Sequence, residues 1–183
     1  MNDQDLKLKI KRIAVEHFNT HGYHGTTIRN IANEVGCSLP MVYYYYKSKK
    51  DLFHEIIKKD YFDMLGRESR RLKAVGIIDF YTEFLLNVMN MSDYDKKVYR
   101  LGIKVYLSFD GDEELLRIME EWEASIVFRH YTLILPHLKD SVHAEAKVRV
   151  LIHLIENIIE RMIVKNQYVS EKEIREELSI IMG

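Results

Sequence analysis

Residues 22–52 read GYHGTTIRNIANEVGCSLPMVYYYYKSKKDL, and this stretch decides the fold. Two short helical patterns meet at Gly36, which suits the left-handed backbone conformation in which a helix ends sharply. Ser38 is placed to cap the next helix. Pro40 is tolerated in the first turn of that helix because the N–H groups there have no intrahelical partner. The stretch therefore predicts a tight corner between two helices.

Apolar residues recur at helical spacing on both sides of this corner. Positions 28, 31, 32 and 35 are apolar, which predicts a helix that begins at Thr26, is capped by the Thr26 hydroxyl and turns Arg29 outward. An apolar stripe over residues 6–18 predicts a preceding helix that ends near Gly22. Three short helices with a sharp corner are the layout of a helix-turn-helix DNA-binding domain.

The composition limits the class of protein. At 183 residues and 47% hydrophobic composition, the chain can form one large domain or two small ones without a metal or a disulfide. The single Cys37 has no internal partner, and an unpaired thiol fits a reducing cytoplasm. The first residues lack a signal-peptide pattern, and every later apolar run is interrupted by charge. We expect a cytoplasmic protein with no membrane span and no cofactor.

The charge is unevenly divided along the chain. The net charge is −1, yet residues 1–50 hold 8 Lys/Arg against 4 Asp/Glu, and the remainder holds 19 against 24. The positive charge therefore lies where the helix-turn-helix pattern lies, as expected for a domain that contacts phosphates.

Longer helical patterns follow residue 67. Helices are predicted at about 77–91, 95–108, 112–137, 142–166 and 170–181. Ser48 with Asp51, and Ser170 with Glu173, have the three-residue spacing of capping boxes. The sequence predicts an all-α protein with a three-helix DNA-binding domain over residues 1–50 and a helical domain over residues 51–183.

The third helix of the first domain has the features of a DNA-reading helix. Val42 and Tyr46 are four residues apart and are expected to pack inward, and the remaining side chains face outward. Four consecutive tyrosines are poorly explained by a core alone, because phenol hydroxyls need partners. Lysines at positions 47, 49 and 50 follow at once, placed to contact phosphates. The alternative is an ordinary small bundle with a solvated basic edge.

These residues resemble the N-terminal signature of TetR-type transcriptional regulators. The matching positions are Gly22-Tyr23, Thr26-Thr27-Ile28, Ile31-Ala32, Val35-Gly36-Cys37-Ser38, Val42-Tyr43, Tyr45-Tyr46, Lys47-Ser48-Lys49 and Leu52. The resemblance covers about 45 residues and implies a bacterial homodimer of about nine helices. It also implies binding to a palindromic double-stranded operator, usually as a repressor, and release by a small molecule in the C-terminal domain.

The resemblance implies roles for individual side chains. Thr27, Tyr43, Tyr45 and Lys49 match positions that commonly contact phosphates, Arg29 matches one that reaches a guanine in some members, and residues 39–41 occupy base-reading positions. Many relatives carry a polar or basic residue among the last three, and this chain does not, so we expect apolar contact with thymine methyls. The predicted DNA-contacting residues are Thr26, Thr27, Arg29, Ser38, Leu39, Pro40, Met41, Tyr43, Tyr44, Tyr45, Lys47 and Lys49.

The C-terminal domain suggests a dimer interface and an effector site. A wide apolar face predicts half of a two-fold four-helix interface formed by Leu151, Ile155, Ile158, Ile159, Met162, Ile174 and Leu178; internal core is the alternative. A small apolar or aromatic effector is expected to contact Phe80, Glu83, Phe84, Tyr99, Tyr106, Trp122 and Phe128, although aromatics at helical spacing are often core.

Other functions find less support in the sequence. It contains no G-x-G-x-x-G, G-x-x-x-x-G-K-[ST], H-E-x-x-H or G-x-S-x-G motif, so we do not expect an enzyme. His17, His21 and His24 are interpreted as chance spacing rather than as metal ligands. The remaining alternative is a DNA-binding dimer that is regulated by a protein partner or that has no small-molecule switch.

Overall fold

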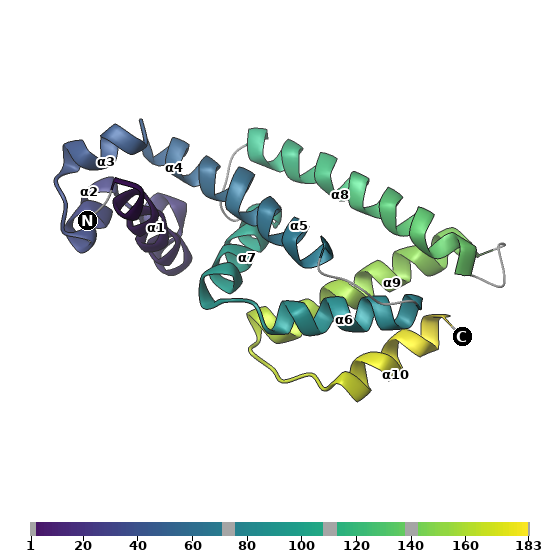
Figure 1. Ribbon diagram of the computed structural model, residues 1–183. Coiled ribbons are helices and arrows are strands. Elements are labelled where there is room, and N and C mark those ends of the chain that lie inside the picture. Colours follow the sequence, from purple (N-terminus) through teal and green to yellow (C-terminus); the bar gives the residue numbers. More distant parts are fainter. Residues whose placement is uncertain (1–2, 71–75, 108–112, 138–142, 183) are drawn as a thin grey trace. The chain divides into compact units, whose positions relative to one another are not determined.

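The computed structural model describes residues 3–70, 76–107, 113–137 and 143–182, and every regular element in these ranges is a helix (Figure 1). The α-helices are α1 (Asp3–Gly25), α2 (Ile28–Val35), α3 (Leu39–Tyr45), α4 (Lys49–Glu55), α5 (Phe62–Arg70), α6 (Ile77–Met89), α7 (Asp93–Tyr106), α8 (Glu113–Ile134), α9 (Ala144–Ile159) and α10 (Glu171–Met182). The π-helix η1 (Ile56–Tyr61) joins α4 to α5, the 3₁₀ turn η2 (Leu135–His137) follows α8, and the π-helix η3 (Glu160–Val164) follows α9.

The all-α prediction is confirmed. With α4, η1 and α5 counted as one continuous helix, and η2 and η3 joined to the helices they follow, the described ranges contain nine helices. The five later predicted helices agree with α6 to α10 within a few residues. Residues 108, 112 and 142, at which three predicted helices end or begin, lie outside the described residues.

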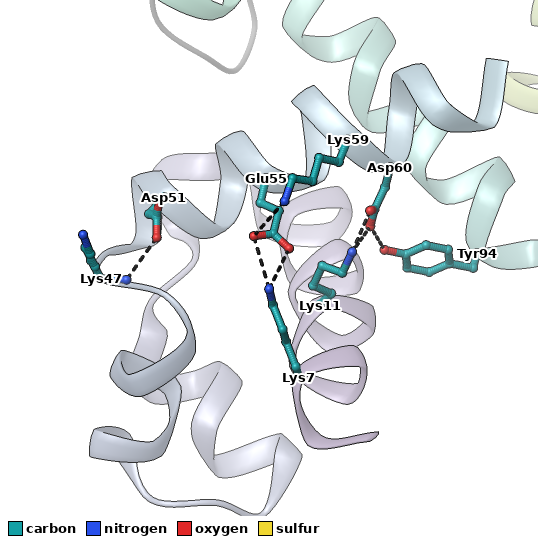
Figure 2. Close-up of polar contacts among 8 residues, drawn as sticks. All are labelled: Lys7, Lys11, Lys47, Asp51, Glu55, Lys59, Asp60 and Tyr94. Atoms are coloured by element: carbon teal, nitrogen blue, oxygen red, sulfur yellow. Dashed lines mark hydrogen bonds and ion pairs between the residues drawn. The ribbon is translucent and has the colours of Figure 1, made fainter. Parts of the chain in front are cut away.

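Local capping explains where the short helices begin and end. Gly36 ends α2 with φ 76°, and its N–H donates to the carbonyls of Ala32 and Asn33. Ser48 accepts from the Asp51 N–H at 3.0 Å. The Asp51 carboxylate in turn accepts from the Lys47 N–H at 3.1 Å, as Figure 2 shows. Because both caps lie beside α3, they fix the start and the end of the segment that carries it.

Three local details differ from the predictions. The cap of α2 is Thr27, whose hydroxyl accepts from the Asn30 N–H at 3.2 Å; the Thr26 hydroxyl instead donates to the Gly22 carbonyl at 2.8 Å. Gly22 (φ 69°, ψ 174°) interrupts α1, as expected, but a last helical turn follows and ends at Gly25. Ser38 occupies the cap position of α3, yet its side chain makes no capping hydrogen bond.

The chain forms two compact units. The first consists of Met1–Leu65 and Ser92–Arg117, and the second of Gly66–Met91 and Ile118–Gly183. In the first unit α7 packs against both α1 and η1, so helices from beyond residue 50 complete the packing of the N-terminal helices. The domain boundary predicted at residue 50, between a DNA-binding domain and a helical effector-binding and dimerisation domain, stays a prediction.

The core of the first unit supports the helix-turn-helix segment from behind. Phe18 of α1 and Phe53 of α4 meet edge to face with ring centroids 4.9 Å apart, and both side chains are buried. Ile31 of α2 and Val42 of α3 are fully buried as well. Burying each such side chain contributes roughly 1.5–3 kcal/mol relative to leaving it exposed. The short helices α2 and α3 therefore depend on α1 and α4 for their stability.

The second unit is built around α9. This helix packs against α6 and α10, which also pack against each other, and Arg161 of η3 donates to Glu177 of α10 at 2.9 Å and pairs with Glu173. The predicted dimer interface is corrected here, because its members are only 0–6% exposed within the single chain: Leu151, Ile155, Ile158, Ile159, Met162, Ile174 and Leu178. The apolar face is wide because α9 has two neighbours in its own chain. None of the described helices is long and apolar enough to cross a membrane.

Candidate nucleic-acid interface

The helix α3 has a buried face and an exposed face, as its spacing predicts. Val42 and Tyr46 are fully buried, and Tyr43 and Tyr44 are 47% and 74% exposed. Met41 is exposed on the first turn and Leu39 is half-buried. The outward surface of α3 is therefore mostly apolar and aromatic, with phenol hydroxyls at its edge.

Tyr46 anchors α3 to the rest of the unit. Its hydroxyl has no hydrogen-bond partner among the described residues, and burial raises the pKa of its phenol. The Lys7 ammonium lies 5.3 Å from the centre of its ring. The large buried ring thus holds the C-terminal end of α3 against α1 by packing rather than by a hydrogen bond.

The hydroxyl of Tyr45 is used inside the unit. It donates to the Asp3 carboxylate at the start of α1, and this hydrogen bond raises the pKa of Tyr45 to about 12. Tyr45 therefore stays neutral and ties α3 to α1, and its hydroxyl must leave Asp3 before it can reach a phosphate. Tyr43, which is exposed, faces no such competition from Asp3.

The helix α2 presents polar side chains beside α3. Thr27, Arg29 and Asn30 are exposed, and the apolar positions 28, 31, 32 and 35 are buried. The Thr27 hydroxyl accepts from a backbone N–H, so its own proton remains available to a phosphate oxygen. Thr26 is 1% exposed and its hydroxyl donates to the Gly22 carbonyl, so its side chain is buried away from the surface on which the predicted DNA contact would lie.

An open hollow of about 480 Å³ lies where the first turns of α2, α3 and α4 come together. Its lining consists of Thr26, Thr27, Ile28, Arg29, Leu39, Tyr43, Lys47, Ser48 and Lys49. The N-terminus of a helix carries unpaired N–H groups and a partial positive charge, both of which favour anions. With one Arg and two Lys at its rim, the hollow has the chemistry to hold phosphate oxygens.

The lysines after α3 are held differently. The Lys49 ammonium donates to the Tyr23 and Thr26 carbonyls at 2.7 and 2.9 Å and lies 4.3 Å from the centre of the Tyr23 ring. Lys50 lies 4.0 Å from the Glu114 carboxylate, and Lys47 is exposed at the rim of the hollow. Lys49 therefore stabilises the loop between α1 and α2 and has one N–H left for a phosphate.

Ion pairs neutralise part of the N-terminal positive charge. Lys7 pairs with Glu55 at 3.2 Å and Lys11 with Asp60 at 2.6 Å, and both acids come from beyond residue 50. The cations that line the hollow are Arg29, Lys47 and Lys49. The positive charge at this surface therefore comes from fewer residues than the count over residues 1–50 suggests.

The predicted effector residues are divided between the two units. Phe80, Glu83, Phe84 and Trp122 are half-buried in the second unit. Tyr99 is buried in the first unit with its ring centre 6.1 Å from that of Tyr61, so it is core there, and Tyr106 is exposed. Phe128 is 67% exposed, so within the single chain it is a surface residue rather than part of a pocket wall.

Sequence reasoning missed a polar pair in the second unit. The Tyr81 hydroxyl and His130 Nδ1 lie 2.6 Å apart, and the two rings stack with centres 5.5 Å apart. Burial, assisted by the charge of Arg129, lowers the pKa of His130 to about 4. His130 is therefore neutral at pH 7, and its Nδ1 shares a hydrogen bond with the Tyr81 hydroxyl. The available signal was a histidine at helical spacing from Ile126 and Val127, a pattern that occurs by chance as well.

The N-terminal region matches a known family. Residues 11–56 match the model described as bacterial regulatory proteins, tetR family. The biofilm operon icaADBC HTH-type negative transcriptional regulator IcaR of Staphylococcus aureus (strain Newman) is 28% identical over 88 residues, 45% of this chain and 47% of that protein. The chain spans about half the length of the curated relatives it matches.

Solved structures match nearly the whole chain. Salmonella enterica GusR aligns with a TM-score of 0.71 and 17% identity over 100% of this chain and 97% of that one. The multidrug binding protein EbrR complexed with imidazole aligns with a TM-score of 0.59 and 17% identity, covering 96% of this chain and 89% of that one. At these identities the likeness shows the fold.

Proposed function

Because this chain belongs to the TetR family of bacterial transcriptional regulators, we propose that it represses transcription as a cytoplasmic homodimer on a palindromic operator. A small apolar or aromatic effector bound by the C-terminal domain would release the operator. The observation that carries the proposal is the hollow formed by three helix N-termini and three cations, directly beside the exposed face of α3. The name of IcaR, a negative regulator, supports repression, and that of EbrR, a multidrug binding protein, supports an effector.

The hollow and α3 would act together on the duplex. Phosphate oxygens would bind at the hollow through Thr27, Lys47 and the helix N-termini, which fixes the register of the domain but carries no sequence information. The exposed side chains of α3 would then lie in the major groove, where Met41 and the tyrosines contact thymine methyls. Arg29 at the edge of α2 would supply a bidentate contact to guanine.

Dimerisation follows from the small size of this surface. One short reading helix makes few base contacts, and two half-sites read together raise the affinity without any new type of contact. Since the predicted interface residues are core, we place the interface on exposed apolar side chains of α8 and α9, with Phe128 and Val150 at its centre. The exposed positions 150, 153 and 157 of α9 follow one another at helical spacing, as a helix packed against a partner requires.

Selection of bound duplexes from random DNA tests the proposal. The expected result is an inverted repeat whose half-site centres lie about one helical turn apart, 34–36 Å, or a little more. Binding should weaken steeply as salt increases, because each neutralised phosphate releases counterions. A selected pool without an inverted repeat, or binding that does not respond to salt, would contradict the proposal.

A further inference from the structure

Asp60 lies at a junction of three helices in the first unit (Figure 2). Its carboxylate accepts from the Lys11 ammonium of α1 at 2.6 and 2.9 Å and from the Tyr94 hydroxyl of α7. The side chains of Lys11 and Asp60 are only 15% and 14% exposed. One carboxylate on η1 therefore binds both α1 and α7, in a place where water screens the charges little.

The contact between η1 and α7 is close on either side of Asp60. A Cβ added to Gly102 of α7 would lie 2.3 Å from the Tyr61 ring, so this glycine lets the two helices approach. Tyr61 is buried and its ring centre lies 6.1 Å from that of Tyr99. Because this packing leaves no space, η1 and α7 form a fixed support for the Asp60 carboxylate.

The π-helix places Asp60 on the buried side. Buried positions recur every fourth residue along this segment, at 52, 56 and 64 and at 53, 57 and 61, and Asp60 falls in the first series. In an α-helix of 3.6 residues per turn, such a series drifts by about 40° per turn. The wider turn of η1, with its i→i+5 hydrogen bonds, offsets that drift and keeps Asp60 facing α1 and α7.

The helix α1 supports α2 and α3, because α2 packs against both α1 and α3. A tilt of α1 by about 10° at Lys11 would move its end near Gly22 by about 3 Å, since a helix rises about 1.5 Å per residue. That displacement is close to the rise of one base pair, about 3.4 Å. A tilt of α1 by this amount is therefore enough to decide whether α3 meets its half-site.

We propose that Asp60 is a positioning residue for operator binding. It holds α1, and with it α2 and α3, at one angle to η1 and α7, and so sets the distance between the two half-sites that the dimer accepts. This inference rests on the proposed dimeric operator binding. Lys11 and Tyr94 act through Asp60, and none of the three needs to touch DNA.

The pair Lys7–Glu55 supplies a matched control. This pair joins α1 to α4 with an N–O distance of 3.2 Å, and its side chains are 39% and 20% exposed. The Lys59 ammonium lies 4.0 Å from the Glu55 carboxylate as well (Figure 2). Pairs as exposed as this one contribute little to holding two helices. Replacing Glu55 should therefore leave the angle of α1 unchanged.

The test measures affinity for operators whose half-sites are moved one base pair closer together or further apart. Wild-type protein should prefer the native spacing by about ten-fold or more. Asp60→Asn and Tyr94→Phe should reduce that preference to about three-fold or less, and Glu55→Gln should keep the wild-type preference. Melting curves identify variants that do not fold. If Asp60→Asn does not fold, the test rests on Tyr94→Phe, because this replacement leaves the ion pair of Lys11 and Asp60 intact.

The outcomes separate this inference from the proposed function. A wild-type protein that binds no operator overturns both. A folded Asp60→Asn or Tyr94→Phe protein with the wild-type spacing preference overturns the inference alone. A loss of affinity that is equal at all three spacings also overturns it, because it indicates a structural role without a role in positioning.

Discussion

Lys49 and Lys47 both line the hollow, yet their surroundings predict different consequences of replacement by methionine. Lys49→Met removes two hydrogen bonds to carbonyls and a contact with the Tyr23 ring. After a discount for partial exposure, the loss should be about 1–2 kcal/mol in the free energy of unfolding. For a chain of this size, that lowers the melting temperature by about 3–6 °C. Lys47→Met should leave the melting temperature within about 2 °C, because exposed substitutions change the free energy of unfolding by about 0.5 kcal/mol or less.

Both variants should weaken DNA binding. If each lysine contacts one phosphate, each replacement lowers the slope of log affinity against log salt by about one unit per protomer. Fluorescence anisotropy with a labelled operator at several salt concentrations measures the slope, and circular dichroism measures melting. The reasoning fails if Lys49→Met melts like the wild type. It fails equally if Lys47→Met binds with unchanged affinity and slope.

Three further predictions concern single positions. Arg29→Ala should relax specificity at one base pair per half-site by about 1–3 kcal/mol, measured by competition with singly substituted operators; unaltered discrimination would remove the guanine contact. Gly102→Ala should lower the melting temperature by several degrees. Overpacking against Tyr61 costs about 1–3 kcal/mol, and this cost exceeds the gain in helix propensity of about 1 kcal/mol. An unchanged or higher melting temperature would contradict the close packing. Burial lowers the pKa of His130 to about 4 in the folded protein, and the pKa is about 6.5 in the unfolded chain. The stability that neutral His130 contributes is therefore fully present above about pH 6.5. It is lost as the pH falls towards 4. The difference in melting temperature between wild type and His130→Gln should change across that window, and a constant difference would refute the assignment.

The features that follow from local sequence were predictable. Gly36, Ser48 and Ser170 act where their residue types indicate, because a left-handed glycine and a side-chain cap depend on a few neighbouring atoms. The choice between Thr26 and Thr27 was beyond the sequence, since both residue types cap helices well. Packing decides it, because Thr26 is buried and Thr27 is exposed.

Features that depend on distant partners could not be predicted. The ion pairs of Lys11 with Asp60 and of Lys50 with Glu114 join residues 49 and 64 positions apart, so the charge count over residues 1–50 overstated the positive surface. The motif predicts only a DNA contact for Lys49, because a motif does not show the two backbone carbonyls that its side chain contacts.

The dimer interface predicted on the apolar face of α9 also depends on distant partners. The width of this face in the sequence predicts a dimer interface, but a helix with two neighbours in its own chain also needs a wide apolar face. The exposed residues Phe128 and Val150, which now mark the proposed interface, stand next to the apolar residues Val127 and Leu151 in the sequence, so the sequence alone does not distinguish them. Only the packing of α9 shows which of its apolar residues remain accessible to a partner.

Ethylation interference on the selected operator tests most directly the claim that the hollow holds phosphates while α3 lies in the major groove. The account predicts two symmetric clusters of essential phosphates, one on the backbone beside the major groove of each half-site. It also predicts that Lys47→Met removes the interference at one phosphate in each cluster. A duplex without such clusters, or a Lys47→Met pattern identical to that of the wild type, would contradict it.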